Sequence, residues 1–297
     1  MKKPNKISLV ICTRNRSEML ARCLEKLKQV RRLPYSPIEI VLVDNNSTDD
    51  TMETIKNFQA SYQGVSKLVE AKKTGLGHAR NCGIQECSGD MIMFTDDDCF
   101  LPEDFLINFF KSCDLNRFQY GMGSIWLANE EDDHRVANMK IERESLIPPG
   151  TAVLPAGIIQ GANMFFAATI FETAGLFNED MGAGTKFPCE DIEMACRASH
   201  SGFTGAMLPG FGVFHAHGRR RDSAEALQTI HSYDYGRGAY YASLLTRGVP
   251  EVWSFWQNSF THERFIAPQN LDRVAREFAG ATQYLQFLMR EKNDQTG

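Results

Sequence analysis

The sequence lacks three features that would each define a class of protein. No stretch of its 297 residues approaches the ~20 apolar residues that a membrane-spanning helix needs. Its eight cysteines form no Cys-x-x-Cys pair, which argues against a zinc knuckle or a thioredoxin-type site and favours a reducing compartment. The formal net charge is -5, whereas nucleic-acid binders usually carry a basic surplus, so we expect no nucleic-acid partner.

The composition is that of a soluble globular protein with a sizeable core. Hydrophobic residues make up 43% and charged residues 23% of the chain. The length suits one large α/β domain, or a domain with an appendage. The apolar run after the N-terminal lysines is too short for a secretory signal, and polar residues interrupt it.

The first part of the chain alternates between short apolar runs and segments with helical spacing. The apolar runs predict buried strands at residues 7–13, 38–43, 65–69 and 91–95. We expect Ser47 or Thr48 to cap the helix that follows the second strand, and Pro102 to open the helix after the fourth. This alternation predicts an α/β fold with a mostly parallel central sheet and helices on both faces.

The second half is less regular. We expect strands at residues 120–127, 160–167 and 213–217, a helix at 190–201 and an exposed, highly charged segment at 129–143. From Ser223 onward, apolar residues recur at helical spacing. The chain is therefore expected to divide into an α/β domain at residues 1–217 and a C-terminal helical extension at 218–297.

Polar residues follow three of the predicted strands. They are Thr13-Arg14-Asn15-Arg16, Asp44-Asn45-Asn46 and Asp96-Asp97-Asp98. Ligands of parallel α/β sheets bind at the carboxyl ends of the strands, so these segments are expected to meet at one site.

The three consecutive aspartates favour a metal site. Like charges at that separation repel each other and raise each other's pKa, and a divalent cation removes this cost. Asp96 and Asp98 can face the same side of an extended turn and hold Mn²⁺ or Mg²⁺ together with substrate phosphates. The alternative is that Asp98 only caps the helix after Pro102.

Five segments, in order along the chain, resemble the motifs of family 2 glycosyltransferases of the GT-A fold. They are the first strand with its Thr13-Arg14-Asn15-Arg16 ending, Val43 to Thr51, Gly75-Leu76-Gly77-His78-Ala79-Arg80-Asn81, Asp96-Asp97-Asp98 and Glu190-Asp191. Each motif alone is weak, but five in the family's order are specific. The resemblance covers roughly residues 5 to 217. It implies a Rossmann-like GT-A domain, to which the C-terminal helices are an addition.

The resemblance also implies roles for individual residues. Residues matching the nucleotide-binding positions are Thr13, Asn15, Arg16, Asp44, Asn46, Arg80, Asp96 and Asp97. Among them, Asp44 corresponds to the acidic residue that reads the base or ribose, and the alternative for Arg80 is a surface arginine.

Asp191 matches the catalytic base of inverting members, and Glu190 is expected to orient the acceptor or to cap the helix. Phe187-Pro188-Cys189 stands where the family often has glycines. Asp98, Asp96 and His215 are the expected metal ligands, with His217 as the alternative histidine.

The expected function is an inverting, metal-dependent transfer of a single sugar from a nucleotide diphosphate sugar to an acceptor hydroxyl. The acceptor would be a saccharide or a lipid-linked saccharide in polysaccharide or glycoconjugate biosynthesis. The expected location is cytoplasmic, and a peripheral contact with the inner face of the membrane stays open. The alternatives are a nucleotide-sugar-forming nucleotidyltransferase and a non-catalytic nucleotide- or carbohydrate-binding module of the same fold.

Overall fold

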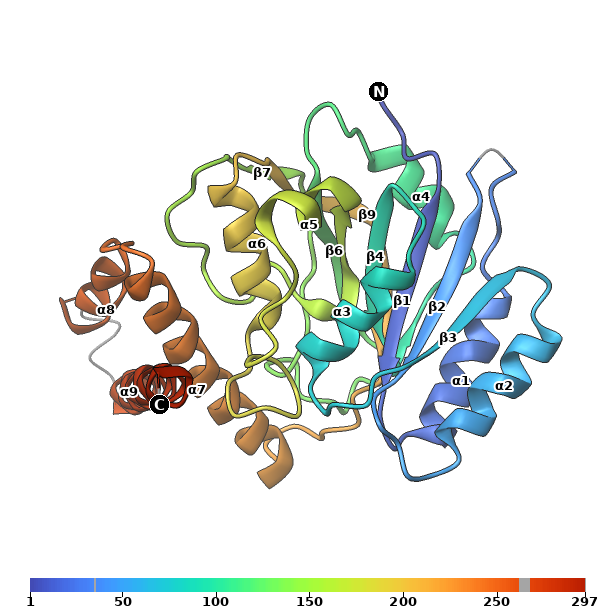
Figure 1. Cartoon of the computed structure of the whole chain (residues 1–297). Helices are drawn as coiled ribbons and strands as arrows, with labels where there is room; N and C mark the ends of the chain where they lie inside the picture. Colours follow the sequence, from blue (N-terminus) through green and yellow to red (C-terminus); the bar gives the residue numbers. More distant parts are fainter. Residues whose placement is uncertain (35, 262–267, 297) are drawn as a thin grey trace.

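A nine-stranded sheet forms the centre of the protein in the computed structural model, which describes residues 1–34, 36–261 and 268–296 (Figure 1). Its first four strands are β1 (Ile7–Thr13), β2 (Ile38–Asp44), β3 (Val65–Glu70) and β4 (Met91–Asp96). They are parallel and lie in the order β3-β2-β1-β4. Because these strands are mostly apolar and β1, β2 and β4 are almost entirely buried, the sheet needs helices on both faces.

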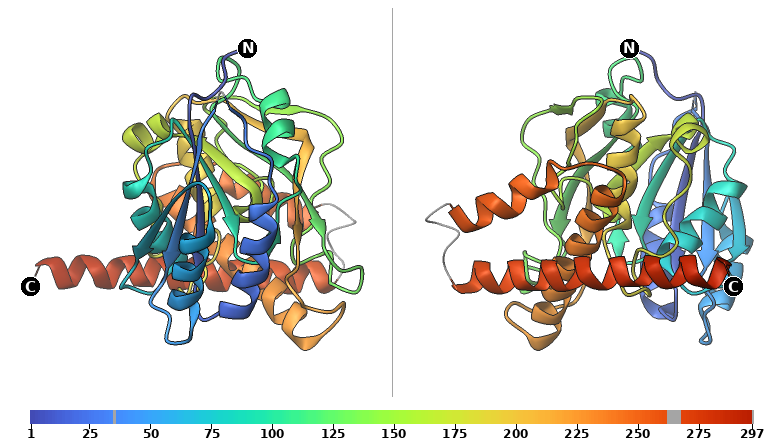
Figure 2. Two further views of the ribbon diagram at one scale, coloured as in Figure 1. Left: turned by 90° about the vertical axis from the view of Figure 1, so that its right-hand side faces the viewer. Right: turned by 60° about the vertical axis from the view of Figure 1, so that its left-hand side comes forward.

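Three helices connect the parallel strands. They are α1 (Ser17–Lys28), α2 (Thr51–Ser61) and α3 (Leu76–Glu86). Right-handed crossovers place α1 and α2 on one face and α3 on the other, because the strand order reverses direction after β3 (Figure 2). All four strands therefore end at the same edge, beside the switch point between β1 and β4.

The sheet continues beyond β4 with mixed strand directions. The added strands are β5 (Cys99–Phe100), β6 (Tyr120–Leu127), β7 (Ser145–Ile147), β8 (Met164–Ala167) and β9 (Gly205–His215). The order after β4 is β8-β6-β9-β5, and β7 pairs with β9. The helices of this part are α4 (Phe105–Ser112), α5 (Ala168–Ala174), α6 (Glu190–His200) and the short 3₁₀ helix η1 (Gly161–Asn163). The predicted α/β class, with its C-terminal helices, is confirmed.

Several local predictions were wrong. The strand expected at 160–167 is shorter than predicted, because the turn of η1 occupies its first part and β8 begins only at Met164. The strand expected at 213–217 is part of the longer β9, which begins at Gly205 and ends at His215. The helix after Pro102 begins only at Phe105. Ser47 and Thr48 do not cap α2: its N-cap is Asp50, and the Asp49 carboxylate accepts the hydrogen bond from the Thr51 N–H at 3.1 Å.

The segment at residues 129–143 is not simply exposed, as the charge pattern had indicated. Asp132, Asp133 and Val136 are buried. The Asp133 carboxylate accepts hydrogen bonds from Arg135, and the Asp133 N–H donates to the Arg219 carbonyl at 2.8 Å. These contacts hold the segment against the chain that follows β9.

The C-terminal extension consists of α7 (Ala224–Thr246), α8 (Val252–Thr261) and α9 (Pro268–Thr296); residues 262–267 and 297 of the expected extension lie outside the described residues. Two glycines let α7 and α9 cross closely. A Cβ atom at Gly238 would lie 1.8 Å from the Glu277 carbonyl oxygen, and one at Gly280 would lie 1.9 Å from that of Tyr235. No described helix is both long and apolar enough to cross a membrane.

Buried ion pairs connect these helices to each other and to the sheet domain. Arg237 of α7 lies 2.8 Å from Glu277 of α9, which also accepts a hydrogen bond from the Trp256 indole at 3.1 Å. Arg247 of α7 lies 3.2 Å from Glu193 of α6. The extension is thus fixed beside α6, at the edge where the strands end.

Candidate active site

The aspartate cluster begins where β4 ends. Asp96 is the last residue of β4, and Asp97 and Asp98 form the turn into β5. Because Cys99 of β5 pairs with His215 of β9, the imidazole comes to lie beside the turn. The Nε2 atom of His215 is 3.1 Å from an Asp98 carboxylate oxygen. Sheet pairing thus joins two residues that lie far apart in the sequence.

Four side chains of this region form a group that fits a divalent metal ion. One ligand atom from each of Asp96, Asp98, Cys99 and His215 lies within 4.8 Å of the others. Carboxylates and an imidazole suit Mn²⁺, while Mg²⁺ prefers oxygen ligands alone. The Nδ1 atom of buried His215 has no hydrogen-bond partner in the described structure, whereas its Nε2 atom faces Asp98.

His217 differs from His215. Its Nδ1 atom accepts a hydrogen bond from the Arg219 N–H at 3.0 Å, and it is not part of the four-residue group. The geometry therefore favours His215 as the ligand. Cys99 was not among the predicted site residues, because its position beside an apolar strand is that of an ordinary core cysteine.

The loop after β1 contacts the aspartates directly. Arg16 lies 2.9 Å from both Asp97 and Asp98, and the Thr13 hydroxyl donates to Asp97 at 2.6 Å. Burial raises the pKa of Asp97 to about 7, although Arg16 opposes this. Burial also disfavours the ionised form of Asp98, but His215 and Arg16 outweigh it and lower the pKa of that carboxyl. Arg16 is thus the cation nearest the cluster from the predicted nucleotide loop.

The other predicted nucleotide residues connect the loops after β1 and β2. Asn15 and Asn46 adopt positive φ angles of 52° and 59°. The Asn15 carboxamide accepts from the Thr48 N–H at 2.7 Å, and the buried Asp44 carboxylate accepts from the Ser47 N–H at 3.3 Å. These bonds give the two strand-end loops one fixed arrangement.

Arg80 is not the surface arginine of the alternative reading. It is only 2% exposed, and its guanidinium forms an ion pair with Glu190 and lies 3.7 Å from Asp96. Gly161 leaves room for this side chain, because a Cβ atom there would lie 2.2 Å from the guanidinium. Arg80 therefore connects the metal-type cluster to the start of α6.

Asp191 lies in the first turn of α6. Its carboxylate accepts hydrogen bonds from the N–H of Gly161 at 2.9 Å and of Ile192 at 2.7 Å. Desolvation by the surrounding protein, together with the charge of Glu190, raises the pKa of Asp191 to about 7. The carboxyl therefore titrates near neutral pH, which is where a general base is most effective.

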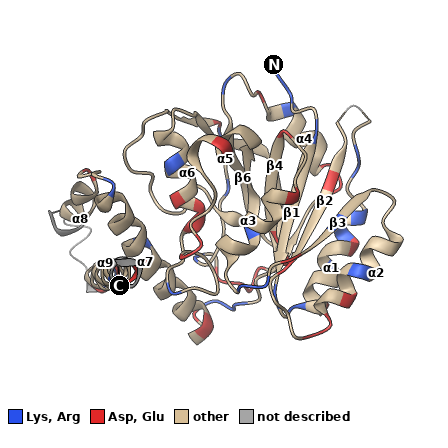
Figure 3. Cartoon of the chain, viewed as in Figure 1, with Lys and Arg blue, Asp and Glu red and all other residues tan. Residues whose placement is uncertain are grey.

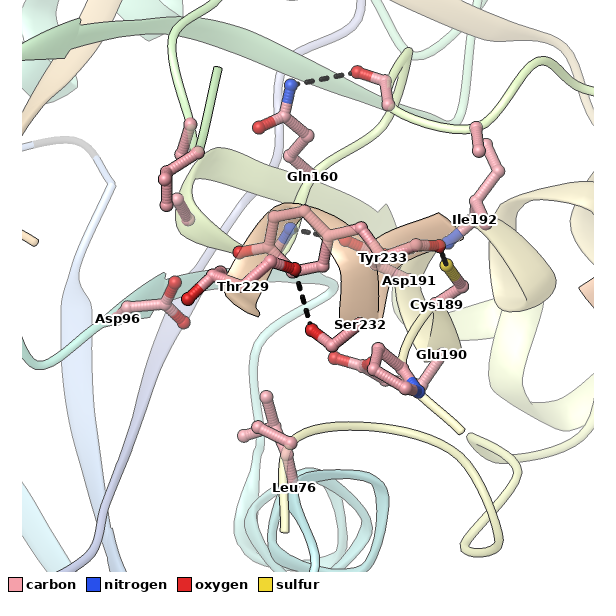
Figure 4. A pocket seen from close by; sticks show the side chains of 18 of the residues that line it. Leu76, Asp96, Gln160, Cys189, Glu190, Asp191, Ile192, Thr229, Ser232 and Tyr233 are labelled. Carbon is pink, nitrogen blue, oxygen red and sulfur yellow. Dashed lines mark hydrogen bonds between the residues drawn. The ribbon is translucent and has the colours of Figure 1, made fainter. Parts of the chain in front are cut away.

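A cavity of about 620 Å³ brings part of these residues together (Figure 4). The predicted site residues that line it are Arg80, Asp96, Glu190, Asp191 and His215. The predicted residues outside its lining are Thr13, Asn15, Arg16, Asp44, Asn46, Asp97 and Asp98. The site thus has two adjoining parts: the loops after β1 and β2, and the cavity beyond Asp96. Figure 3 shows that this edge of the sheet carries residues of both charge signs.

The cavity also has walls that sequence reasoning did not assign. Thr229, Ser232, Tyr233 and Arg237 of α7 line it, and so does Arg219 after β9. A close contact brings α7 there, since a Cβ atom at Gly236 would lie 2.4 Å from the Pro188 carbonyl oxygen. The sequence from Ser223 onward is compatible with a segment that covers one side of an acceptor site, meets a membrane-borne acceptor or only packs on the domain, so the sequence alone did not place Tyr233 at the cavity.

The fold and the site define an α/β protein with a cluster of potential metal ligands at the switch point of its sheet. The family model of glycosyl transferase family 2 matches residues 8–172, and the chain belongs to this family. The predicted family membership is therefore confirmed.

Among curated relatives, the glycosyltransferase AglE of Haloferax volcanii is 34% identical over 100 residues, which are 34% of this chain and 33% of AglE. The matches to the next two curated relatives span only 19% and 18% of their lengths.

Solved structures share the fold. A mannosyltransferase of Pyrobaculum calidifontis, in complex with GDP-Man and Mn²⁺, has a TM-score of 0.59 at 15% identity over all of this chain and 81% of that one. Residues 1–349 of S. aureus TarS, in complex with UDP-GlcNAc, have a TM-score of 0.52 at 15% identity over 93% of this chain and 81% of that one.

Proposed function

We propose that this chain is an inverting, metal-dependent glycosyltransferase that moves a single sugar from a nucleoside diphosphate sugar to an acceptor hydroxyl. The observation that carries the proposal is the shared cavity of Asp96, His215 and Asp191. The cavity offers two potential metal ligands, Asp96 and His215, and the carboxyl group of Asp191, whose pKa is raised to about 7. An inverting transfer needs both in one place.

The donor nucleotide would lie over the loops after β1 and β2. The Asp44 carboxylate would accept from a base N–H or a ribose hydroxyl, and Thr13, Asn15, Arg16 and Asn46 would line the same edge. Arg16 already forms ion pairs with Asp97 and Asp98. Two solved structures of the same fold were obtained with GDP-Man and UDP-GlcNAc, which supports a nucleoside diphosphate sugar as donor.

Asp96, Asp98 and His215 would hold Mn²⁺ or Mg²⁺, with Cys99 adjacent. The bound ion would neutralise the charge that grows on the departing diphosphate. Arg219 lines the same cavity and would add a positive charge near that group. Arg80 holds Glu190 and lies beside Asp96, so it would keep the two halves of the site in register.

Asp191 would act as the general base. An acceptor hydroxyl is a weak nucleophile at neutral pH, and a positioned carboxylate can take its proton as the bond to the anomeric carbon forms. The Gly161 and Ile192 N–H groups fix the carboxylate, and Glu190 is occupied by Arg80. Glu190 would therefore orient Asp191 and the start of α6 rather than remove the proton itself.

The acceptor would enter from the side of α7. We propose residues 1–217 as the GT-A catalytic domain and 218–297 as a helical extension whose α7 helix completes the cavity through Tyr233 and Arg237. A saccharide or lipid-linked saccharide fits this proposal. A Campylobacter jejuni relative, 29% identical over 94 residues, is named GalNAc(5)-diNAcBac-PP-undecaprenol beta-1,3-glucosyltransferase, so the acceptor in its name is a saccharide linked to undecaprenol.

The test is a nucleotide-release assay with purified protein and panels of nucleoside diphosphate sugars and saccharide acceptors, with and without Mn²⁺. The expected result is release of a nucleoside diphosphate that requires both acceptor and metal. A thermal-shift screen of the same donors first identifies the nucleotide, because a ligand that binds only the folded state raises Tm. Full activity in excess chelator would contradict the metal assignment, and metal-dependent donor binding without any transfer would contradict the enzymatic function.

A further inference from the structure

The α9 helix carries a largely exposed stripe, of which one member, Phe278, stacks on Trp256 of α8. It consists of Leu271, Ala275, Phe278, Thr282, Leu285 and Met289. Its four large members are between 37% and 66% exposed. Figure 2 shows α9 running along the outside of the molecule, with its C-terminal end projecting beyond the sheet domain. The stripe is therefore accessible along its whole length.

The spacing of the stripe is that of a helix face that packs against another helix. Its members follow one another at alternating steps of four and three residues. This is the 3.5-residue repeat of a seam between two helices that coil around each other. The helix already has a separate buried face, with Val274, Glu277, Ala281 and Tyr284, toward the rest of the protein. The exposed stripe, called the seam below, is thus a second contact face of α9, and its spacing fits packing against another helix.

The side chains of the stripe are complementary to those of a second copy of the same stripe that runs in the opposite direction. About a two-fold axis at the level of residue 280, antiparallel pairing places Leu271 opposite Met289. It also places Ala275 opposite Leu285 and Phe278 opposite Thr282, so a large side chain meets a small one at each inner level. We infer that α9 pairs antiparallel with the α9 helix of a second copy of this chain.

Charge on the flank of the seam agrees with this partner. Asp272 and Arg290 are both exposed and lie near opposite ends of the same side of the helix. Antiparallel pairing brings the acidic end of one helix to the basic end of the other. A membrane surface would instead favour a row of Lys and Arg beside the apolar stripe, whereas Gln283 and Gln286 occupy the flank between these charges.

The seam is short, and its length sets the expected affinity. From Leu271 to Met289 it runs about 27 Å at ~1.5 Å per residue. An interface of one helix pair buries less than the roughly 1,200 Å² of a stable complex, so the dimer should dissociate in the micromolar range. Phe278 strengthens the seam, because its ring stacks on Trp256 with centroids 4.5 Å apart and is thereby fixed in position.

The experiment is sedimentation velocity of the full chain between about 2 and 200 µM. The wild-type protein is expected to shift from monomer to dimer across this range. Ala275→Glu places a charge in the seam and should weaken dimerisation at least tenfold. Gln283→Glu adds the same charge to an exposed position of the same helix outside the seam, and it should dimerise like wild type. Circular dichroism and Tm measurements check that both variants are folded.

A charge swap tests the direction of pairing. Ala275→Glu combined with Leu285→Lys should restore the dimer, because antiparallel pairing places opposite charges together, while parallel pairing places like charges together. The inference is overturned if wild type stays monomeric at about 200 µM, if Ala275→Glu dimerises like wild type, or if the swap does not restore it. Seam-dependent binding of the monomer to anionic phospholipid vesicles would assign the stripe to a membrane instead.

Discussion

Arg80 of α3 and Glu190 of α6 form a buried ion pair inside the cavity. This ion pair gives the two adjacent carboxylates, Glu190 and Asp191, different hydrogen-bond partners. Glu190 pairs with the Arg80 guanidinium, whereas the Asp191 carboxylate accepts hydrogen bonds from the backbone N–H groups of Gly161 and Ile192. Of the two carboxylates, Asp191 is therefore the one without a cationic side chain hydrogen-bonded to it in the described structure, in agreement with the general-base role proposed for it.

Breaking the Arg80–Glu190 pair should destabilise the protein. Arg80→Met leaves a buried carboxylate uncompensated, which costs about 3–5 kcal/mol, and Glu190→Gln leaves a buried guanidinium. The double variant should recover part of this loss, because neither charge remains. Urea unfolding of the two single variants and the double variant measures the coupling. Strictly additive losses would show that the two side chains do not interact.

The metal site predicts different effects for two neighbouring histidines. His215→Gln and Asp98→Asn should each weaken Mn²⁺ binding by about tenfold or more, because each removes a ligand. His217→Gln is the matched control and should bind Mn²⁺ normally, since its ring is held by the Arg219 N–H. Isothermal titration with Mn²⁺ and nucleoside diphosphate measures these affinities. Equal losses for both histidines would contradict the assignment.

The nucleotide site predicts a role for Asp44. Asp44→Asn should weaken nucleoside diphosphate binding by about tenfold, because a carboxylate accepts more strongly than a carboxamide from the base or ribose. Glu70→Gln is the matched control. Glu70 is the register partner of Asp44 on β3, also ends its strand and is exposed. Calorimetric affinities that are equal for wild type and Asp44→Asn would remove Asp44 from the nucleotide site.

The contribution of α7 predicts an acceptor effect. Tyr233 lines the cavity together with Asp96 and Asp191. Tyr233→Ala should raise KM for the acceptor by about tenfold, because the ring forms part of the wall on which a sugar would pack. Nucleoside diphosphate affinity should stay the same, since the nucleotide loops lie elsewhere. A loss confined to nucleotide affinity would place α7 on the donor side instead.

Sequence reasoning predicted the parallel half of the fold well, because its strands are mostly apolar and β1, β2 and β4 are followed by polar residues. It could not predict that β8 and β6 run antiparallel to each other, or that β5 has only two residues, because such pairing depends on distant segments. The same limit applies to the site. The aspartates could be read from three adjacent letters, but the pairing of Cys99 with His215 depends on the sheet.

The burial of Asp132 and Asp133 shows a further limit of sequence patterns. A run of charges reads as solvent-exposed, yet Arg135 and the backbone after β9 satisfy these carboxylates inside the protein. The α7 wall shows another, since Tyr233 reaches the cavity through tertiary contacts of α7, among them the close approach of Gly236 to Pro188. The sequence motifs indicated candidate residues of the site, whereas the residues that surround them could be identified only from tertiary contacts.

The general-base role of Asp191 predicts both a rate and a pH dependence. Asp191→Asn keeps the size of the side chain and removes the base, so turnover should fall by about 10²-fold or more while donor affinity is retained. The pKa of Asp191 is raised to about 7, so the ionised fraction is lost as pH falls through that value. Turnover of wild type should therefore fall as pH decreases below 7, by about tenfold per unit well below the pKa.

The same pKa predicts how this variant affects stability. A carboxyl whose folded pKa is raised binds its proton more tightly in the folded state, so its ionised form costs stability above the unfolded pKa of about 4. Asp191→Asn removes this cost, and its Tm at pH 7.5 should equal or exceed that of wild type. The variant would then be a folded protein that lacks only the base. A lower Tm, or turnover equal to wild type, would assign Asp191 a structural role, and a product that retains the donor's anomeric configuration would exclude the inverting mechanism.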